Sequence, residues 1–128
     1  MRVFIAGATG AVGRRLVPLA LRAGHQVSGM TRSEERASAL RAAGVEAAVA
    51  DALNRAAVAR ARPEVVVHQL TALSSFTNPR RFDREFEATN LLRTQGATNL
   101  IAAAHAADAL RFVAQSFTGW PYARTGKD

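Results

Sequence analysis

Three evenly spaced glycines near the start of the chain are the residues best suited to binding chemistry. Gly7, Gly10 and Gly13 follow directly after the apolar segment 2–6 and open a helical pattern. Gly7 permits a tight turn, Gly10 leaves room for a diphosphate to approach the backbone, and Gly13 lets the helix pack closely against the sheet. A position between a strand and a helix favours a phosphate-binding turn over glycines placed by chance.

The backbone amides of the same turn would provide the positive charge that a diphosphate needs. The N–H groups of Gly10, Ala11 and Val12 are expected to point at the phosphates from the N-terminal end of the helix, where the helix dipole is positive. Thr9 lies in the same turn and belongs to the candidate site. The alternative is a tight strand-to-helix connection that binds nothing, but three glycines at this spacing favour a dinucleotide site.

The elements that must position this turn alternate regularly along the chain. Strands are expected at 2–6, 26–30, 45–50, 65–70 and 110–115, and helices at about 11–22, 33–43, 51–62 and 81–106. This alternation predicts an α/β fold, a Rossmann-type doubly wound parallel sheet of five strands in the order 3-2-1-4-5, with helices on both faces. Residues 1–128 are expected to form one domain, in which the long helical region 81–106 could be interrupted.

Residues at the expected helix ends support these boundaries. Ser33 is a favourable N-cap, and Gly24 and Gly44 suit the ends of two helices. Pro18 lies inside the first helix, where it removes a backbone hydrogen bond and could bend the helix. His68 lies within an apolar strand and is interpreted as a buried histidine with satisfied ring nitrogens, not as a catalyst.

Several further segments carry the sequence pattern of a known family. They are 51–53 after the third strand, 66–72 at the fourth, 90–104 on the long helix and 112–116 at the fifth. Together with the glycine turn, they resemble the extended and atypical short-chain dehydrogenases/reductases, the NAD(P)-dependent epimerase/dehydratase proteins. The resemblance covers nearly the whole chain. It implies an NAD(P)-binding Rossmann domain of a protein that transfers hydride between the nicotinamide and a carbonyl, hydroxyl or sugar-nucleotide substrate.

The resemblance also bears on the choice of cofactor. NAD-selective members end the second strand with an acidic residue that binds the ribose hydroxyls. Thr31 and Arg32 occupy that place here, so no carboxylate repels a 2′-phosphate, and Arg32 could pair with one. NADP(H) is therefore favoured and NAD(H) is the alternative, while Arg32 could instead be a solvated arginine at a helix start.

The family pattern implies further cofactor contacts after the third and fourth strands. Asp51 would accept a hydrogen bond from the adenine amino group, with Leu53 beside the ring and Ala52 between the two. Asp51 is also a natural N-cap for the next helix, and the two roles are compatible. Open α/β sheets bind ligands at the carboxyl ends of their strands. The residues that would line the cofactor beyond the fourth strand are Leu70, Thr71 and Ala72.

Catalysis in this family uses a serine or threonine after the fifth strand and a Tyr-x-x-x-Lys pair, whose lysine lowers the tyrosine pKa. Ser116 is the preferred hydroxyl by its distance from the fifth strand, whereas counting back from Tyr122 favours Thr118. Lys127 lies five residues after Tyr122, not four, so these two are not interpreted as the catalytic pair. The alternative to an enzyme is a non-catalytic NAD(P)H sensor that keeps the glycine turn.

The family continues beyond this chain with further strands and a substrate-binding region. A piece of a larger enzyme is therefore preferred over a naturally short protein, and the missing part would cover the edge of the fifth strand. For a protein of 128 residues alone, that exposed edge predicts a homodimer or poor solubility.

The amino-acid composition limits the classes of partner that the chain is expected to bind. Hydrophobic residues (48%) and charged residues (21%) are in the range of soluble globular proteins, and no window approaches the roughly 20 apolar residues that span a bilayer. A cytoplasmic protein without a membrane partner is expected.

The chain has no cysteine and its three histidines are isolated, so no metal is predicted. The net charge of +7 comes from scattered arginines, which favours an anionic cofactor and a small-molecule substrate over nucleic acid.

Overall fold

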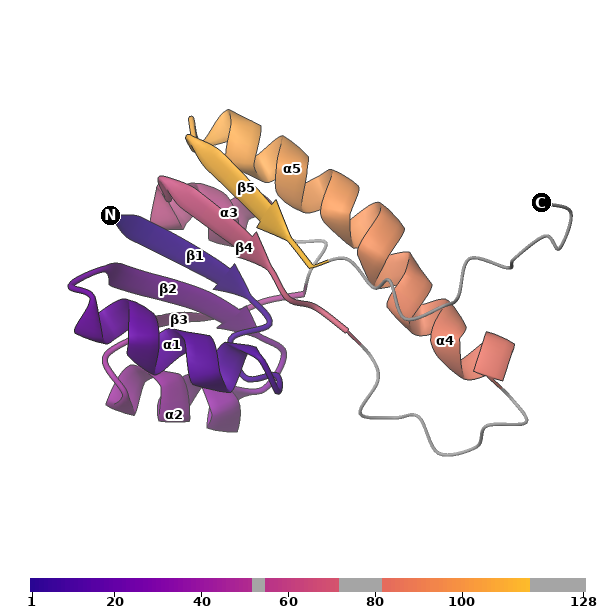
Figure 1. Ribbon diagram of the computed structural model, residues 1–128, viewed down its shortest axis with the longest axis horizontal. Helices are drawn as coiled ribbons and strands as arrows, with labels where there is room; N and C mark the ends of the chain where they lie inside the picture. Colours follow the sequence, from indigo (N-terminus) through magenta and orange to yellow (C-terminus); the bar gives the residue numbers. More distant parts are fainter. Residues whose placement is uncertain (52–54, 72–81, 116–128) are drawn as a thin grey trace, which may run out of the picture.

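Five parallel strands form the centre of the fold, in the order β3-β2-β1-β4-β5 (Figure 1). The computed structural model describes residues 1–51, 55–71 and 82–115. The strands are Arg2–Ala6 (β1), Gln26–Thr31 (β2), Glu46–Val49 (β3), Val65–His68 (β4) and Arg111–Ala114 (β5). The helices are Gly13–Arg22 (α1), Glu34–Ala42 (α2), Arg55–Ala61 (α3), Phe82–Leu91 (α4), the π-helical turn Leu92–Gly96 (η3) and Ala97–Ala106 (α5). The predicted Rossmann-type architecture and strand order are confirmed.

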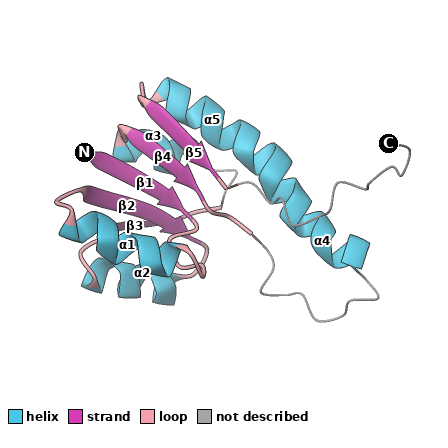
Figure 2. Cartoon of the chain, viewed as in Figure 1, coloured by secondary structure: helices cyan, strands magenta, loops and turns pink. Residues whose placement is uncertain are grey.

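Both faces of the sheet are covered, which explains why β1 after Arg2 and β4 before His68 are apolar. Figure 2 shows α1 and α2 on one face and α3 and α5 on the other. Val3 and Ile5 of β1 pack in the core beneath α1 and α2. Phe4 and Ala6 alternate with them and pack in the second core, beneath α3 and α5. Successive side chains of a strand point to opposite faces, so one short segment contributes to both cores.

The helix ends follow the signals in the sequence. The Ser33 hydroxyl accepts a hydrogen bond from the Arg36 N–H at 3.4 Å, as expected of an N-cap. Gly24 and Gly44 follow α1 and α2 with φ of +81° and +87°, the left-handed conformation in which helices commonly end. Pro18 lies inside α1, as predicted.

Two elements differ from the expected boundaries. Strand β4 ends at His68, two residues early, because the Leu70 N–H bonds to the imidazole of His68 and leaves the strand ladder. The expected interruption of the long helix is the π turn η3, through which the chain passes from α4 to α5 without a break. No helix in the described ranges is long and apolar enough to cross a membrane.

Candidate functional site

The glycine turn connects the carboxyl end of β1 to the N-terminus of α1. Gly7 follows β1 with φ of +94°, a backbone conformation that favours glycine. The Gly10 N–H donates to the Gly7 carbonyl at 3.0 Å, and the Gly10 carbonyl accepts from the Arg14 N–H at 2.9 Å. These two bonds close the turn and join it to the first turn of α1.

Close packing explains two of the three glycines. A Cβ at Gly7 would lie 2.7 Å from the Gln69 carbonyl oxygen, just beyond β4. A Cβ at Gly13 would overlap the Gly7 carbonyl and lie 2.7 Å from the Ala8 Cα, so Gly13 packs against the turn itself and not against the sheet as expected. A Cβ at Gly10 would be 3.2 Å from the Gly7 carbonyl, and this glycine is exposed. The exposure of Gly10 agrees with the predicted approach of a diphosphate to the backbone at this turn.

The turn also presents backbone donors. Ala11 and Val12 are exposed, and their N–H groups donate to no acceptor within the described residues. The Gly10 N–H, expected to be a third donor toward a phosphate, instead closes the turn. Unpaired N–H groups at the N-terminal end of a helix form a site for an anion, because the helix dipole adds to their partial charge. Thr9 is half-buried in the same turn.

The end of β2 lies beside this turn. Strand pairing aligns Met30 with Ala6, so the residues that follow both strands emerge at the same edge of the sheet. Thr31 is buried and its hydroxyl accepts from the Ser33 N–H at 3.4 Å, whereas Arg32 is exposed. The nearby carboxylate of Glu34 is turned to Arg41, with Oε1 and Nη1 2.6 Å apart. Arg32 is therefore available to an anionic group at this edge.

Further predicted contacts follow β3 and β4 at the same edge. The Ala50 N–H donates to the Thr31 carbonyl at 2.9 Å, and the exposed Asp51 comes next. Leu70 is half-buried and packs against the core beneath α3 and α5, while Thr71 is exposed. Other predicted site residues lie outside the described residues: Ala52, Leu53, Ala72, Ser116 and Thr118. Tyr122 and Lys127, which were not interpreted as a catalytic pair, lie outside them as well.

His68 is the buried titratable residue nearest to this edge. Its Nε2 lies 3.1 Å from the Leu92 carbonyl, and its Nδ1 accepts from the Leu70 N–H at 3.2 Å. The ring also meets Phe112 edge to face, with 6.5 Å between the centroids. Burial lowers the pKa of His68 below its ordinary value, the Leu92 bond raises it, and the charge of Arg93 lowers it further. The prediction of a satisfied, buried histidine is confirmed.

Sequence reasoning did not predict the contacts that His68 and Gln69 make at the carboxyl end of β4. Gln69 lies against Gly7 through its backbone, and its N–H donates to the Ala6 carbonyl at 2.8 Å. The available signal was a polar pair, His68 and Gln69, directly after an apolar strand. Such a pair marks the place where a strand leaves the core.

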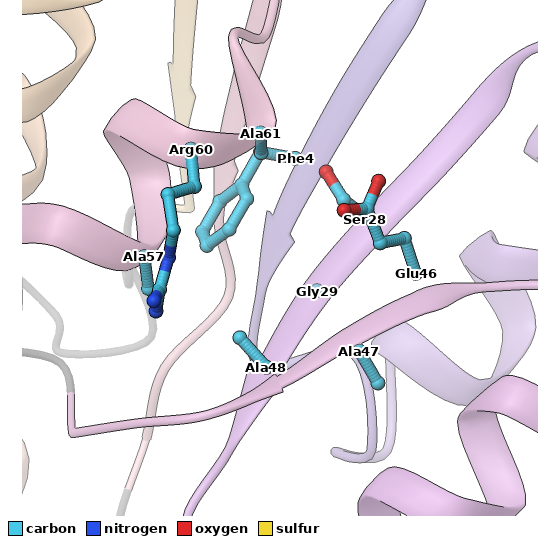
Figure 3. A pocket seen from close by; sticks show the side chains of 9 residues that line it. All are labelled: Phe4, Ser28, Gly29, Glu46, Ala47, Ala48, Ala57, Arg60 and Ala61. Carbon is cyan, nitrogen blue, oxygen red and sulfur yellow. The ribbon is translucent and has the colours of Figure 1, made fainter.

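A separate cavity of about 270 Å³ lies between α3 and strands β2 and β3 (Figure 3). Alanines of β3 and α3 form much of its wall, and its polar side chains are Ser28, Glu46 and Arg60. None of its lining residues belongs to the glycine turn. The cavity is therefore distinct from the edge described above.

Comparisons with known proteins agree with this arrangement. A family described as NAD(P)H-binding matches residues 7–127. A 3-diazoavenalumate denitrifying reductase from a Streptomyces species is 47% identical over 120 residues, which cover 91% of this chain and 38% of that protein. The chain thus spans well under half the length of this curated relative.

Solved structures show the same fold in longer chains. A Bacillus halodurans protein assigned by name to the NAD-dependent epimerases/dehydratases has a TM-score of 0.75 and 29% identity, over 93% of this chain and 52% of that one. The enzyme WbmG of Bordetella bronchiseptica, solved with NAD and UDP, has a TM-score of 0.63 and 25% identity, over 89% and 36% of the two chains.

Proposed function

The chain belongs to the NAD(P)H-binding family that its sequence matches, and we propose that it is the cofactor-binding part of an NAD(P)-dependent oxidoreductase. The observation that carries the proposal is the pair of N–H groups at Ala11 and Val12, which donate to no acceptor among the described residues and lie beside the exposed Gly10. The relative named as a reductase, at 47% identity, supports the reaction class.

The residues at the carboxyl edge of the sheet fit a dinucleotide. Ala11 and Val12 would bind the diphosphate through their N–H groups, beside the exposed Gly10. Asp51 would accept a hydrogen bond from adenine, and Leu70 and Thr71 would line the nicotinamide half. The bound cofactor would supply the hydride chemistry, while the protein supplies orientation.

We favour NADP(H) over NAD(H) on the evidence of Arg32. This side chain is exposed one residue beyond β2, on the same edge as the glycine turn. A guanidinium there can pair with a 2′-phosphate by charge-assisted hydrogen bonds. The substrate is proposed to be a small molecule with a carbonyl, hydroxyl or sugar-nucleotide group, and Ser116, or alternatively Thr118, is proposed as the hydroxyl that assists the reaction.

Binding of NADPH and NADH to Gly10→Asp tests the assigned site. An aspartate would put both bulk and negative charge in the space proposed for the diphosphate. We expect its affinity for both cofactors to fall at least tenfold, which corresponds to about 1.4 kcal/mol. Isothermal titration calorimetry measures the change, and circular dichroism checks that the variant is folded.

Ser38→Asp is the matched control, because it adds the same charge at an exposed position of α2. This variant should bind both cofactors as the unmodified chain does. Equal affinity of Gly10→Asp and Ser38→Asp would refute the site, and a wild-type chain that binds neither cofactor would refute the function.

A further inference from the structure

The end of β4 is held between the glycine turn and the long helix. On one side, the Gln69 carbonyl lies against Gly7, and the Gln69 N–H bonds to the Ala6 carbonyl. On the other side, the ring of His68 reaches the Leu92 carbonyl in η3. Residues 69–71 therefore cannot shift without changing their contact with one of these two elements.

The hydrogen bonds of His68 fix the state of its ring. A backbone N–H can only donate and a carbonyl can only accept, so Nδ1 must accept from Leu70 and Nε2 must carry the proton donated to Leu92. Only the neutral ring with its proton on Nε2 makes both bonds. His68 is 5% exposed, so water does not readily replace either partner.

The acceptor of the second bond lies in an unusual part of the helix. Leu92 is the first residue of η3, and π turns within α-helices are rare and frequently occur at functional sites. Leu70 and Leu92 are 22 positions apart in the sequence, and the imidazole joins the backbone of one to the backbone of the other.

We propose that His68 is a positioning residue for the cofactor. Its imidazole ring holds Leu70 and Thr71 in the place where the nicotinamide half would bind. The proposal rests on the proposed function, since it assigns a role toward the same dinucleotide. It separates two halves of the site. His68 governs the half beyond β4, whereas the adenosine half depends on the ends of β2 and β3.

Two substitutions remove the two hydrogen bonds separately. Asparagine carries a polar atom near the position of Nδ1, so His68→Asn keeps an acceptor for Leu70 and loses the bond to Leu92. Glutamine reaches the position of Nε2, so His68→Gln keeps a donor for Leu92 and leaves the Leu70 N–H without its acceptor. Each variant is therefore the matched control of the other.

The test measures binding of NADPH and of 2′-phospho-AMP to the chain by calorimetry. The second ligand has the adenosine half alone and does not extend to β4. We expect His68→Gln to bind NADPH about five- to tenfold more weakly, the effect of about one hydrogen bond, and His68→Asn to stay within about threefold of wild type. Both variants should bind 2′-phospho-AMP as wild type does.

Acidification of the wild-type chain should imitate His68→Gln. A protonated ring keeps the donor to Leu92 but cannot accept from Leu70. Arg93 of η3 is the charged group that acts on the ring, while Phe112 of β5 faces it without charge. Burial keeps the pKa of His68 below its ordinary 6.5, so the affinity that depends on this ring should fall only below that pH. The pH series uses NADH, because the 2′-phosphate of NADPH has a second pKa of about 6 and would titrate in the same range. His68→Asn should lack this step.

The outcomes separate the two proposals. If wild type binds NADPH and His68→Gln binds it equally well, the positioning role is wrong. If both variants lose affinity for 2′-phospho-AMP and NADPH alike, His68 serves only the fold and the inference is again overturned. If wild type binds neither ligand, the failure lies with the proposed function.

Discussion

Arg32 is the residue whose environment best separates the two nicotinamide cofactors. It is exposed one position beyond β2, and the nearby Glu34 is paired with Arg41. A 2′-phosphate at this place would therefore meet a guanidinium whose neighbour Glu34 is held by Arg41.

Arg32→Ala should weaken NADPH binding at least tenfold and NADH binding less than threefold, because charge-assisted hydrogen bonds contribute about 1.5–3 kcal/mol. Calorimetric titration of both cofactors measures the two changes. Arg36→Ala, at an exposed arginine of α2, is the control and should alter neither affinity. Equal losses of NADPH and NADH in Arg32→Ala would contradict a contact with the 2′-phosphate.

The residues of the candidate site differ in how far sequence could predict them. Gly7 and Gly13 were predictable because no other residue fits their conformation or packing. The burial of His68 was predictable from its apolar strand, but its bond to Leu92 was not. That bond depends on a π turn, which has no recognisable sequence pattern, and on the packing of a distant helix against β4.

At the scale of elements, α1 contains a local conflict between propensity and structure. Pro18 is exposed in the middle of this helix, and it lacks the N–H that would donate to the Arg14 carbonyl. Burial of Val17 and Ala20 beneath α1 holds the helix on the sheet in spite of that loss.

Pro18→Ala should raise the free energy of unfolding by about 1–3 kcal/mol, since alanine restores the hydrogen bond and removes the clash of the proline ring. Urea denaturation followed by circular dichroism measures the change in the free energy of unfolding. Arg15→Ala, an exposed change in the same helix, should stay within about 0.5 kcal/mol of wild type. An unchanged or lower stability of Pro18→Ala would mean that the proline fits a bend on which α1 depends.

Every strand and helix followed from hydrophobic periodicity and from glycine and serine signals, but several boundaries did not. Strand β3 is confined to Glu46–Val49 and β4 to Val65–His68, both shorter than their apolar segments. An apolar segment marks burial, whereas a strand requires pairing with a neighbour. At β4 the strand ends before the apolar segment does, because the Leu70 N–H donates to the ring of His68 and not to a neighbouring strand.

At the scale of the whole molecule, the outer edge of β5 is the least protected part of the described sheet. Strand β5 pairs with β4 on one side, and its residues are mostly exposed. Val113 is 49% exposed and aligns with Val67, which is buried in the core beneath α1 and α2. An exposed edge with apolar side chains favours pairing with another chain.

We expect the 128-residue chain to self-associate through this edge, with a sedimentation coefficient that rises with concentration. Val113→Lys should reduce the association, because lysine on an edge strand opposes strand pairing. Leu19→Lys, at an apolar residue of α1 that is 55% exposed, should leave it unchanged. Equal behaviour of the two variants in analytical ultracentrifugation would place the contact elsewhere.

The opposite edge of the sheet, along β3, is partly covered by a side chain. Arg41 donates from Nη2 to the Ala47 carbonyl of β3 at 3.2 Å, and its Nη1 is paired with Glu34. A peptide approaching β3 would have to displace this guanidinium, whereas no comparable side-chain contact within residues 1–51, 55–71 and 82–115 covers the outer edge of β5. The sheet therefore has one edge, at β3, that a side chain partly covers and one edge, at β5, that is more accessible to another strand. A strand supplied in trans, or fused by a linker, should extend it past β5 and not past β3.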